Sequence, residues 1–337
     1  MKPYDRILLE HGGGGLLSNE LISKIFLPML KNPLLEELHD GAVFEAEGSR
    51  FCFTTDSFVV QPRFFPGGDI GSLAVHGTVN DIAMCGGIPL ALSAGFILEE
   101  GFPMEELERV VRSMADAARS AGVVVATGDT KVVPRGGADG LFINTSGIGI
   151  VRYGSPLSVR SIRPGDAVLI NGPIGDHGAA ILSARGQLGF SSAIRSDSAP
   201  LNGLVETILA ASPDIHCMRD ATRGGLGAIL AEIAGQSGMR ITIRQTAIPV
   251  RSEVRGICEI LGFDPLFLAN EGRMALFCAG GAAEEILGVM RRHPLGGDAA
   301  LVGMVAEDRR GRVIMETLVG GSREIDLPTG ELVPRIC

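Results

Sequence analysis

The sequence predicts an α/β protein of two domains, each built on a mixed sheet. Its 337 residues suffice for two domains of ordinary size. Strand-like and helix-like segments alternate along both halves, as in domains whose helices pack on sheets. The 47 glycines fall at turns and in short clusters, without a collagen-like period. We therefore expect an N-terminal arm, two α/β domains and a flexible C-terminal tail, at 1–38, 39–155, 156–317 and 318–337.

The first half contains two marked helices and several strands. Pro103–Ala121 is the clearest helix, because it has a proline near its start, early acidic residues and Gly122 after its last turn. Asp69–Cys85 is a second helix, rich in small residues. The predicted strands are Leu90–Leu98, a hairpin of Val43–Glu47 and Arg50–Thr55, and the apolar segments Val123–Ala126 and Leu141–Val151, which we expect to be central.

The second half follows a loop at Ser161–Asp166 and repeats the mixture. The predicted strands are Ala167–Asn171, Arg240–Arg244, Met274–Ala279 and Leu301–Val305. The predicted helices are Gly178–Gly186, Gly203–Ala211, Gly225–Gly235, Glu253–Leu261 and Ala282–Arg292.

Charge and cysteine content exclude several classes of protein. The net charge of −9 argues against a nucleic-acid partner and, more mildly, against an anionic membrane surface. No apolar run is long enough to span a bilayer, and the first residues lack a secretory signal. The six cysteines form no CxxC pair, so neither a disulfide framework nor a spaced zinc site is expected. A reducing cytoplasm is the expected setting, with Cys337 the one cysteine whose position predicts exposure.

Four aspartates of the first half occur in Gly- and Thr-rich segments that we interpret as turns. They are His39-Asp40-Gly41-Ala42, Thr55-Asp56-Ser57, Gly77-Thr78-Val79-Asn80-Asp81 and Gly128-Asp129-Thr130-Lys131. Carboxylates and a lysine suit Mg²⁺ and nucleotide phosphates. Each segment alone is ordinary turn chemistry, whereas four in one domain favour a site. The chain has neither a GxxxxGK[ST] phosphate loop nor a GxGxxG fingerprint, so any nucleotide site must use another architecture.

Three further segments allow a functional and a structural interpretation. His11-Gly12-Gly13-Gly14-Gly15 precedes an amphipathic helix near Leu16 and is either an anion cradle or a flexible arm. Asp220-Ala221-Thr222-Arg223-Gly224-Gly225 precedes a helix and suits either phosphate or a helix cap. Glu271 and the Asp176-His177 pair occur in segments where turn chemistry is the commoner outcome.

The chain ends in Cys337, on a tail that contains Gly320-Gly321, Pro328 and Pro334. A terminal thiol is either incidental to a frayed end or a chemical handle. The diglycine would serve as a pivot and the prolines would restrict the arm.

The order of these motifs resembles the HypE family of hydrogenase maturation proteins. The motifs are HGGGG, HDGA, TTDS, GTVNDIAM, GDTKVV, DATRGG, ANEG and PRIC, and they extend from His11 to Cys337. GTVND and GDTK are typical of the whole superfamily of aminoimidazole ribonucleotide synthetase, selenophosphate synthetase and thiamine monophosphate kinase, whereas the terminal PRIC is specific. The resemblance implies a two-domain synthetase-like fold whose N-terminal domains pair into a barrel-like homodimer, with ATP and Mg²⁺ near the interface.

The resemblance also implies a reaction, that of an ATP-dependent carbamoyl dehydratase. The carbamoyltransferase HypF would place a carbamoyl group on Cys337. The chain would then use ATP to dehydrate this thiocarboxamide to a thiocyanate, and the cyanide would pass to iron on the HypC–HypD complex for a nickel–iron hydrogenase. Phosphorylation would turn the amide oxygen into a leaving group, and a base would take the N–H protons.

The resemblance assigns roles to particular residues. Asp40, Asp56, Asp81 and Asp129 match acids that bind Mg²⁺ and ATP, with Asn80 and Thr130 beside them. Lys131 and Glu271 match a pair near the modified thiol, with the lysine steadying negative charge and Glu271 taking a proton. The further phosphate contacts would be His11, Gly13, Gly14, Thr222, Arg223 and Gly224. Two alternatives remain open, namely another ATP-dependent enzyme of the superfamily acting on a small phosphorylated substrate, and a non-catalytic scaffold that displays a thiol tail.

Overall fold

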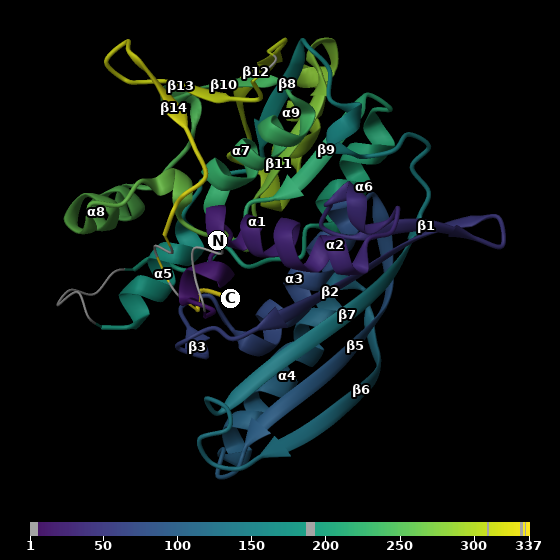
Figure 1. Ribbon diagram of the computed structural model, residues 1–337, viewed down its shortest axis with the longest axis vertical. Coiled ribbons are helices and arrows are strands. Elements are labelled where there is room, and N and C mark those ends of the chain that lie inside the picture. Colours follow the sequence, from purple (N-terminus) through teal and green to yellow (C-terminus); the bar gives the residue numbers. More distant parts are fainter. Residues whose placement is uncertain (1–5, 187–192, 309, 331–332, 334) are drawn as a thin grey trace.

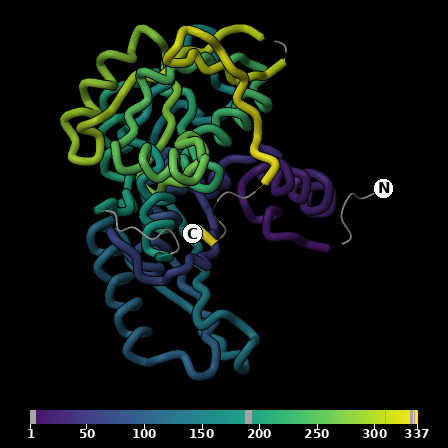
Figure 2. The backbone as a smooth tube through the Cα atoms, turned by 90° about the vertical axis from the view of Figure 1, so that its left-hand side faces the viewer, coloured from purple at the N-terminus to yellow at the C-terminus, as the bar shows by residue number. Residues whose placement is uncertain are grey.

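The structure is a computed structural model that describes residues 6–186, 193–308, 310–330, 333 and 335–337. Two α/β domains lie one above the other, and the N-terminal arm crosses between them (Figure 1). The C-terminal end of the chain lies at the junction of the domains (Figure 2). Pro334, which we expected to restrict the tail, lies outside the described residues.

The N-terminal domain is a five-stranded mixed sheet with two helices on one face. The arm contains α1 (Leu16–Leu21), a π-helical segment (Ile22–Phe26) and α2 (Leu27–Leu30), and the domain contains β1 (Ala42–Ala46), β2 (Ser49–Phe58), β3 (Phe64–Phe65), β4 (Gly68–Asp69), α3 (Ile70–Met84), β5 (Gly87–Glu99), α4 (Met104–Ala121), β6 (Val124–Val133) and β7 (Leu141–Val151). The strand order is β1-β2-β7-β5-β6, and β5 and β6 form its one parallel pair.

The C-terminal domain is a seven-stranded mixed sheet with helices on both faces. It contains β8 (Asp166–Ile170), α5 (Asp176–Ala184), α6 (Asn202–Ala211), β9 (Ile215–Asp220), α7 (Gly225–Ser237), β10 (Arg240–Arg244), α8 (Ser252–Leu261), β11 (Met274–Ala279), α9 (Ala283–Arg292), β12 (Ala300–Ala306), β13 (Val313–Glu316) and β14 (Ser322–Ile325). The order is β14-β13-β10-β12-β8-β11-β9. One buried cluster joins α7 to the sheet, and a second joins α6 and α9. The prediction of two α/β domains with mixed sheets is confirmed.

Helix α3 connects the two domains. Asp69 caps its N-terminus by accepting hydrogen bonds from the N–H groups of Gly71 and Ser72. The helix packs on the N-terminal sheet, on α4, and on α6 and β9 of the second domain. Its approach to the sheet is close, since a Cβ atom at Gly147 would lie 2.7 Å from Ile82 Cδ1. Residues of α3 are thus held rigidly where the two domains meet.

The end of helix α4 agrees with the prediction from sequence, whereas the position of β6 in the sheet does not. Gly122 terminates α4 in the left-handed conformation at φ 68°, as its position after the last turn predicted. The expectation that Val123–Ala126 forms a central strand is wrong, because β6 is the edge of the sheet and most of its residues are exposed. The prediction that Leu141–Val151 is a central strand is confirmed, since β7 lies in the middle of the sheet.

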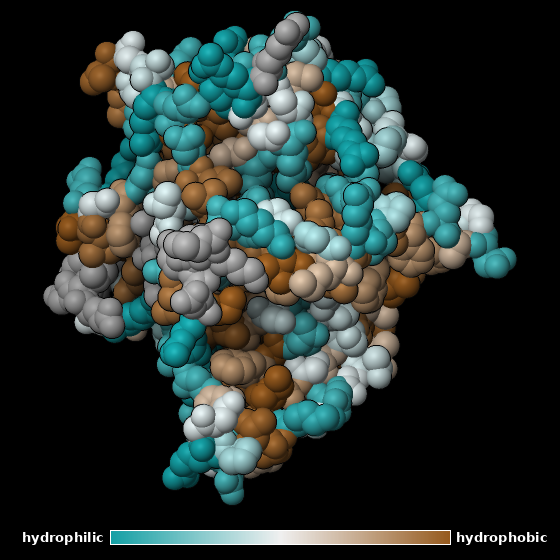
Figure 3. All heavy atoms as spheres, viewed as in Figure 1, coloured by the Kyte–Doolittle hydropathy of each residue, from teal (hydrophilic) through white to brown (hydrophobic). Residues whose placement is uncertain are grey.

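No helix or strand of the described residues covers the face of the N-terminal sheet opposite α3. Phe53 and Ile148 are neighbours on it and are 46% and 36% exposed, and Ile97 is 44% exposed. Figure 3 shows apolar side chains gathered over the lower half of the molecule, where this sheet lies. We call this surface the open face. Among the described residues, no helix is long and apolar enough to cross a membrane.

The chain beyond 317 contains regular structure that the sequence did not predict. Strand β14 pairs antiparallel with β13, and Gly320-Gly321 lies in the turn between them. The expected pivot is therefore part of a hairpin, and no helix or strand follows Ile325 among the residues that the structure describes. Strand β9 was also missed.

Candidate active site

Three carboxylates converge where α3 meets the C-terminal domain. Asp40 precedes β1, Asp81 lies in α3 and Asp220 ends β9, and one oxygen atom from each lies within 4.8 Å of the others. Thr54 Oγ1 lies 2.8 Å from both Asp81 Oδ2 and the Asp40 carbonyl oxygen. Arg219 Nε donates to Asp40 Oδ1 at 2.5 Å, whereas Asp40 Oδ2 is buried without a partner among the described residues.

The electrostatics of this cluster fit a divalent cation. Burial raises the pKa of Asp81 well above its ordinary value, and the charges of Asp220 and Asp40 raise it further. The pKa of Asp220 is raised by burial and then by the charge of Asp40. Buried carboxylates that repel one another are stabilised by a bound cation, and their oxygen atoms are the ligands that Mg²⁺ prefers. The residues present therefore fit Mg²⁺.

Asp56 and Glu271 border this cluster. Burial raises the pKa of Asp56, partly offset by the Arg223 guanidinium. Glu271 is 3% exposed, and its Oε1 has no partner among the described residues. The pKa of Glu271 is raised well above its ordinary value by burial and then by the charges of Asp220 and Asp56. Glu271 is thus a buried carboxyl with an unused acceptor atom, unlike the satisfied turn carboxylate that is commoner for an isolated glutamate.

Asn80 positions the Glu271 loop in this structure. Its Nδ2 donates to the carbonyl oxygen atoms of Ala199 (3.1 Å) and Glu271 (3.3 Å). Its Oδ1 accepts the N–H of Leu201 at 2.7 Å. The amide is therefore engaged in joining α3 to the C-terminal domain.

The glycine-rich segment, the Arg223 loop and the tail meet in space. Arg223 Nη1 donates to the Gly12 carbonyl oxygen at 3.2 Å, and Gly13, Arg223, Gly224 and Ile336 line one small cavity. Gly14 adopts φ +73°, and a Cβ atom there would lie 2.9 Å from the Arg223 carbonyl oxygen. Thr222 is the first residue of a turn in which the Gly225 N–H donates to the Thr222 carbonyl oxygen. His11 Nδ1 accepts the Leu8 N–H at 3.0 Å, so the imidazole caps its own turn.

Cys337 is buried, so the prediction of an exposed thiol is wrong for this structure. It is 8% exposed and packs with Val333 and Ile336 against the N-terminal domain. The backbone explains this position, because Val59 N–H donates to an oxygen of the Cys337 main-chain carboxylate (2.9 Å) and Gln61 N–H donates to the Arg335 carbonyl oxygen (3.1 Å). Val59 directly follows β2, which carries Asp56. None of the six cysteines, all of them described, forms a disulfide.

Asp129, Thr130 and Lys131 lie apart from the cluster. They belong to β6, whereas we expected a turn, and β5 and β7 separate β6 from β2. The strand register places Asp129 beside Gly95 and Asn144, so Asp129 and Lys131 project from the open face and Thr130 does not. Lys131 Nζ pairs with the Asp129 carboxylate, and this bond lowers the pKa of Asp129. One chain alone does not bring these residues to Glu271.

The other predicted turns also differ from expectation. Asp56 lies within strand β2 and Asp81 within helix α3, and Asp40 alone of the four aspartates lies outside regular structure. Asp220 was not selected from the sequence, although it opens the DATRGG segment. The signal that identifies it is its place at the carboxyl end of a strand, and β9 was not recognised.

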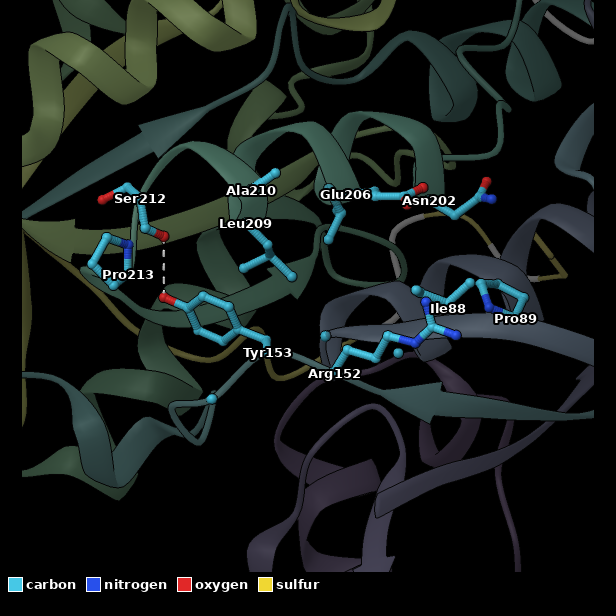
Figure 4. A pocket seen from close by; sticks show the side chains of 14 residues that line it. Ile88, Pro89, Arg152, Tyr153, Asn202, Glu206, Leu209, Ala210, Ser212 and Pro213 are labelled. Carbon is cyan, nitrogen blue, oxygen red and sulfur yellow. Dashed lines mark hydrogen bonds between the residues drawn. The ribbon is translucent and has the colours of Figure 1, made fainter. Parts of the chain in front are cut away.

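A separate cavity of about 520 Å³ lies at the junction of the domains and contains none of these residues (Figure 4). Arg152 and Tyr153 border it on one side, and Glu206 and Leu209 of α6 on the other. Tyr153 Oη donates to the Ser212 carbonyl oxygen at 3.3 Å and accepts the Ile215 N–H at 3.2 Å. Tyr153 therefore joins the domains.

Comparison with known proteins identifies the family of this chain. The description AIR synthase related protein applies to both domains, with its N-terminal domain matching residues 38–151 and its C-terminal domain matching 163–316. A protein of Azotobacter vinelandii named Carbamoyl dehydratase HypE is 54% identical over 329 residues, which cover 98% of this chain and 96% of that protein. The chain belongs to the HypE family.

Solved structures of the HypE family have the same architecture. A crystal structure of hydrogenase maturation protein HypE in complex with ATP is 50% identical, covers 98% of this chain and 100% of its own, and superimposes with a TM-score of 0.83. A crystal structure of a HypE–HypF complex is 47% identical, covers 91% of this chain and 99% of its own, and gives a TM-score of 0.87. The predicted HypE resemblance and its two-domain fold are confirmed.

Proposed function

We propose that this chain is an ATP-dependent carbamoyl dehydratase that converts a thiocarboxamide on Cys337 to a thiocyanate. The observation that carries the proposal is the docked chain end, whose main-chain carboxylate accepts a hydrogen bond from Val59, the residue directly after the strand that contains Asp56. The thiol is thereby a substrate carrier tethered beside a buried acidic cluster. The names of the relatives support the activity, and the ATP complex of one supports ATP as co-substrate.

The proposed reaction needs a leaving group and a base. ATP transfers its γ-phosphoryl group to the carbamoyl oxygen as one N–H proton is lost, which gives an S-linked imidate phosphate and ADP. The C–O bond then breaks as the second N–H proton leaves, which forms the C≡N bond and releases phosphate. Glu271 accepts a proton, because its Oε1 is unpartnered and its raised pKa makes it a stronger base than an exposed glutamate.

Asp40, Asp81 and Asp220 would hold Mg²⁺, with Asp56 next to them. The ion would screen the phosphate charge of ATP. Gly13, Arg223 and Gly224 line a cavity together with Ile336 of the tail. We propose that they and the adjoining Gly14 and Thr222 contact the nucleotide, with Arg223 supplying positive charge.

We further propose a homodimer that closes the open face. This face exposes Phe53, Ile97 and Ile148, and it carries Asp129 and Lys131 away from their own chain's cluster. Apolar surface of this kind is typical of a permanent interface. A second copy would bring the side chains of Asp129 and Lys131 to the nucleotide, where Lys131 would steady negative charge. The Thr130 side chain points to the other face of β6 and would not take part.

The proposed partners are HypF as carbamoyl donor and the HypC–HypD complex as cyanide acceptor, which serves a nickel–iron hydrogenase. A solved HypE–HypF complex supports the first. The absence of disulfides among the six cysteines supports a reducing cytoplasm.

Mass spectrometry of the intact chain tests the proposal. After incubation with HypF and carbamoyl phosphate, the C-terminal peptide should gain one carbamoyl group, and with Mg²⁺ and ATP it should then lose one water. Cys337→Ser is the matched control and should stay unmodified. A C-terminal peptide that stays unmodified in the wild-type chain would contradict the proposal, and carbamoylation without loss of water would leave the chain a thiol scaffold.

A further inference from the structure

His177 binds the peptide group that precedes the carrier cysteine. The residue lies in the first turn of α5 and is fully buried. Its Nε2 lies 2.7 Å from the Ile336 carbonyl oxygen, and its Nδ1 lies 2.8 Å from Ser196 Oγ. The ring also stands edge-on to Phe65, with centroids 5.4 Å apart. The Asp176-His177 segment, which we interpreted as turn chemistry, is therefore a contact with the tail.

The hydrogen bonds fix the tautomer of His177. The Ile336 carbonyl oxygen can only accept, so Nε2 carries the hydrogen and Nδ1 of a neutral ring must accept. Ser196 Oγ meets this need, because it accepts the Ser198 N–H at 3.1 Å and keeps its own hydrogen for Nδ1. Burial lowers the pKa of His177, which favours the neutral ring. His177 is thus preorganised as a hydrogen-bond donor to the tail.

The segment that orients His177 also orients the proposed base. Asp197 follows Ser196, and its two carboxylate oxygen atoms accept the N–H groups of Glu271 and Gly272 at 3.1 Å each. His177 and Glu271 are therefore both held by hydrogen bonds to the Ser196-Asp197 segment. The position of the Ile336 peptide is linked through it to the position of the Glu271 carboxyl.

The tail is held mainly through its backbone. The carbonyl oxygen atoms of Arg335 and Ile336 accept hydrogen bonds from Gln61 N–H and His177 Nε2, respectively. An oxygen of the Cys337 main-chain carboxylate accepts one from Val59 N–H. Arg185 Nη2 also donates to the Arg335 carbonyl oxygen at 3.2 Å. His177 is the side chain that binds the peptide group next to the thiol, so its substitution alters docking at that point.

We propose that His177 is a positioning residue that latches the tail, so that Cys337 stays docked for dehydration and is released for partners when this bond opens. The inference rests on the proposed function for its catalytic consequence. The docking itself is independent of the reaction, since it concerns the accessibility of one thiol.

The test compares His177→Phe, which keeps the ring and removes the donor, with His177→Gln, whose amide restores an N–H near Nε2. Cys337 is labelled with a brief pulse of iodoacetamide and quantified in the C-terminal peptide. Loss of a buried hydrogen bond predicts labelling about tenfold faster in His177→Phe. His177→Gln should return towards the wild-type rate. ATP affinity should be unchanged, while single-turnover loss of water from the carbamoylated thiol slows about tenfold.

His76→Phe is the matched control, because His76 Nδ1 makes an equivalent bond to Ser198 Oγ (2.9 Å) and has no hydrogen bond to the tail among the described residues. Wild-type labelling in His177→Phe, or equal acceleration in His76→Phe, would overturn the proposal. Cys52 and Cys278 are 0% exposed, so labelling of either thiol reports unfolding. If His177→Phe unfolds, the folded variant His177→Gln decides. A wild-type rate of Cys337 labelling in His177→Gln supports the latch, and a fast rate overturns it. If the proposed function is wrong, neither the wild type nor any variant will lose water from a carbamoylated Cys337. The difference in Cys337 labelling between His177→Phe and the wild type will remain.

Discussion

Glu271 and Lys131 lie on opposite sides of the N-terminal sheet. Glu271 is held beneath α3 by Asn80, whereas Lys131 projects from the open face on the edge strand β6. The two residues that the resemblance pairs are therefore separated within one chain. If both act on one thiol, Lys131 must come from a second copy.

A mixing experiment tests this composite site. Lys131→Ala and Glu271→Gln chains should each be inactive alone. When they are mixed and allowed to exchange subunits, activity should return to about one quarter of wild type, because half of the dimers are mixed and each has one intact site. ATP-dependent loss of water from the carbamoylated thiol is the measured quantity. Activity that stays at zero in proven mixed dimers would mean that both residues serve the same chain's site.

Asp220→Asn should stabilise the chain without ligand and weaken its binding of Mg²⁺ and ATP. Removing a buried charge beside Asp40 should raise the melting temperature of the apo chain, because burial and like charge raise the pKa of Asp220. The added stabilisation by Mg²⁺ and ATP should fall, with affinity reduced about tenfold or more. Thermal unfolding with and without ligand measures both. Asp214→Asn, at an exposed residue directly before β9, is the control and should change neither.

Glu271→Gln should remove a base while keeping the side-chain shape. We expect ATP affinity to stay within about twofold of wild type and the single-turnover loss of water to slow by about 10²–10⁴. Quench and mass analysis of the C-terminal peptide measures the rate. An exposed residue, Glu259→Gln, is the matched control. A wild-type rate in Glu271→Gln would assign the proton to another group.

His76 should make the fold sensitive to mild acid. Burial lowers its pKa from 6.5 to about 4. Between these values the unfolded chain binds a proton that the folded chain does not, so the contribution to stability is present above pH 6.5 and is lost as pH falls towards 4. At pH 5.5 this amounts to about 1.4 kcal/mol.

Urea unfolding at pH 7.5 and 5.5 measures this effect. His76→Phe lacks the group, so its unfolding free energy should fall by about 1.4 kcal/mol less than that of the wild type. Equal losses in the two proteins would show that His76 is protonated in the folded state at pH 5.5.

The local sequence predicted most of the fold, because several helices and strands have recognisable residues both at their ends and along their length. Helix α4 has a proline, early acids and a terminal glycine. Strand β10 alternates polar and apolar residues, β11 is a short apolar run, and the bounds of both match the prediction. Strand β9 was missed because His216, Arg219 and Asp220 interrupt its apolar pattern. Strand β6 appeared central because its exposed valines, Val124 and Val125, resemble core residues in the sequence.

The site was harder to predict than the fold. Sequence motifs identified Asp40, Asp81 and Glu271, yet burial of Glu271 depends on Asn80, 191 residues away. Burial of Cys337 depends on backbone pairing with Val59 and Gln61, and backbone pairing leaves no mark in the sequence. Placing the Asp129–Lys131 segment outside the cluster of its own chain required knowledge of the strand order and of the face of β6 that each side chain occupies.

Helix α3 has a consequence for interpreting mutational data. Thirteen of its 15 residues are buried, among them Asn80, and the helix is wedged between a sheet, a second helix and the other domain. Even its glycines have no room to vary, since a Cβ atom at Gly71 would lie 2.3 Å from the Val110 carbonyl oxygen. In a saturation mutagenesis screen, nearly every position of α3 would therefore score as essential. Such a profile would not distinguish a ligand from a packing contact, and the isosteric exchanges Asn80→Asp and Asp81→Asn would be the informative members of the library.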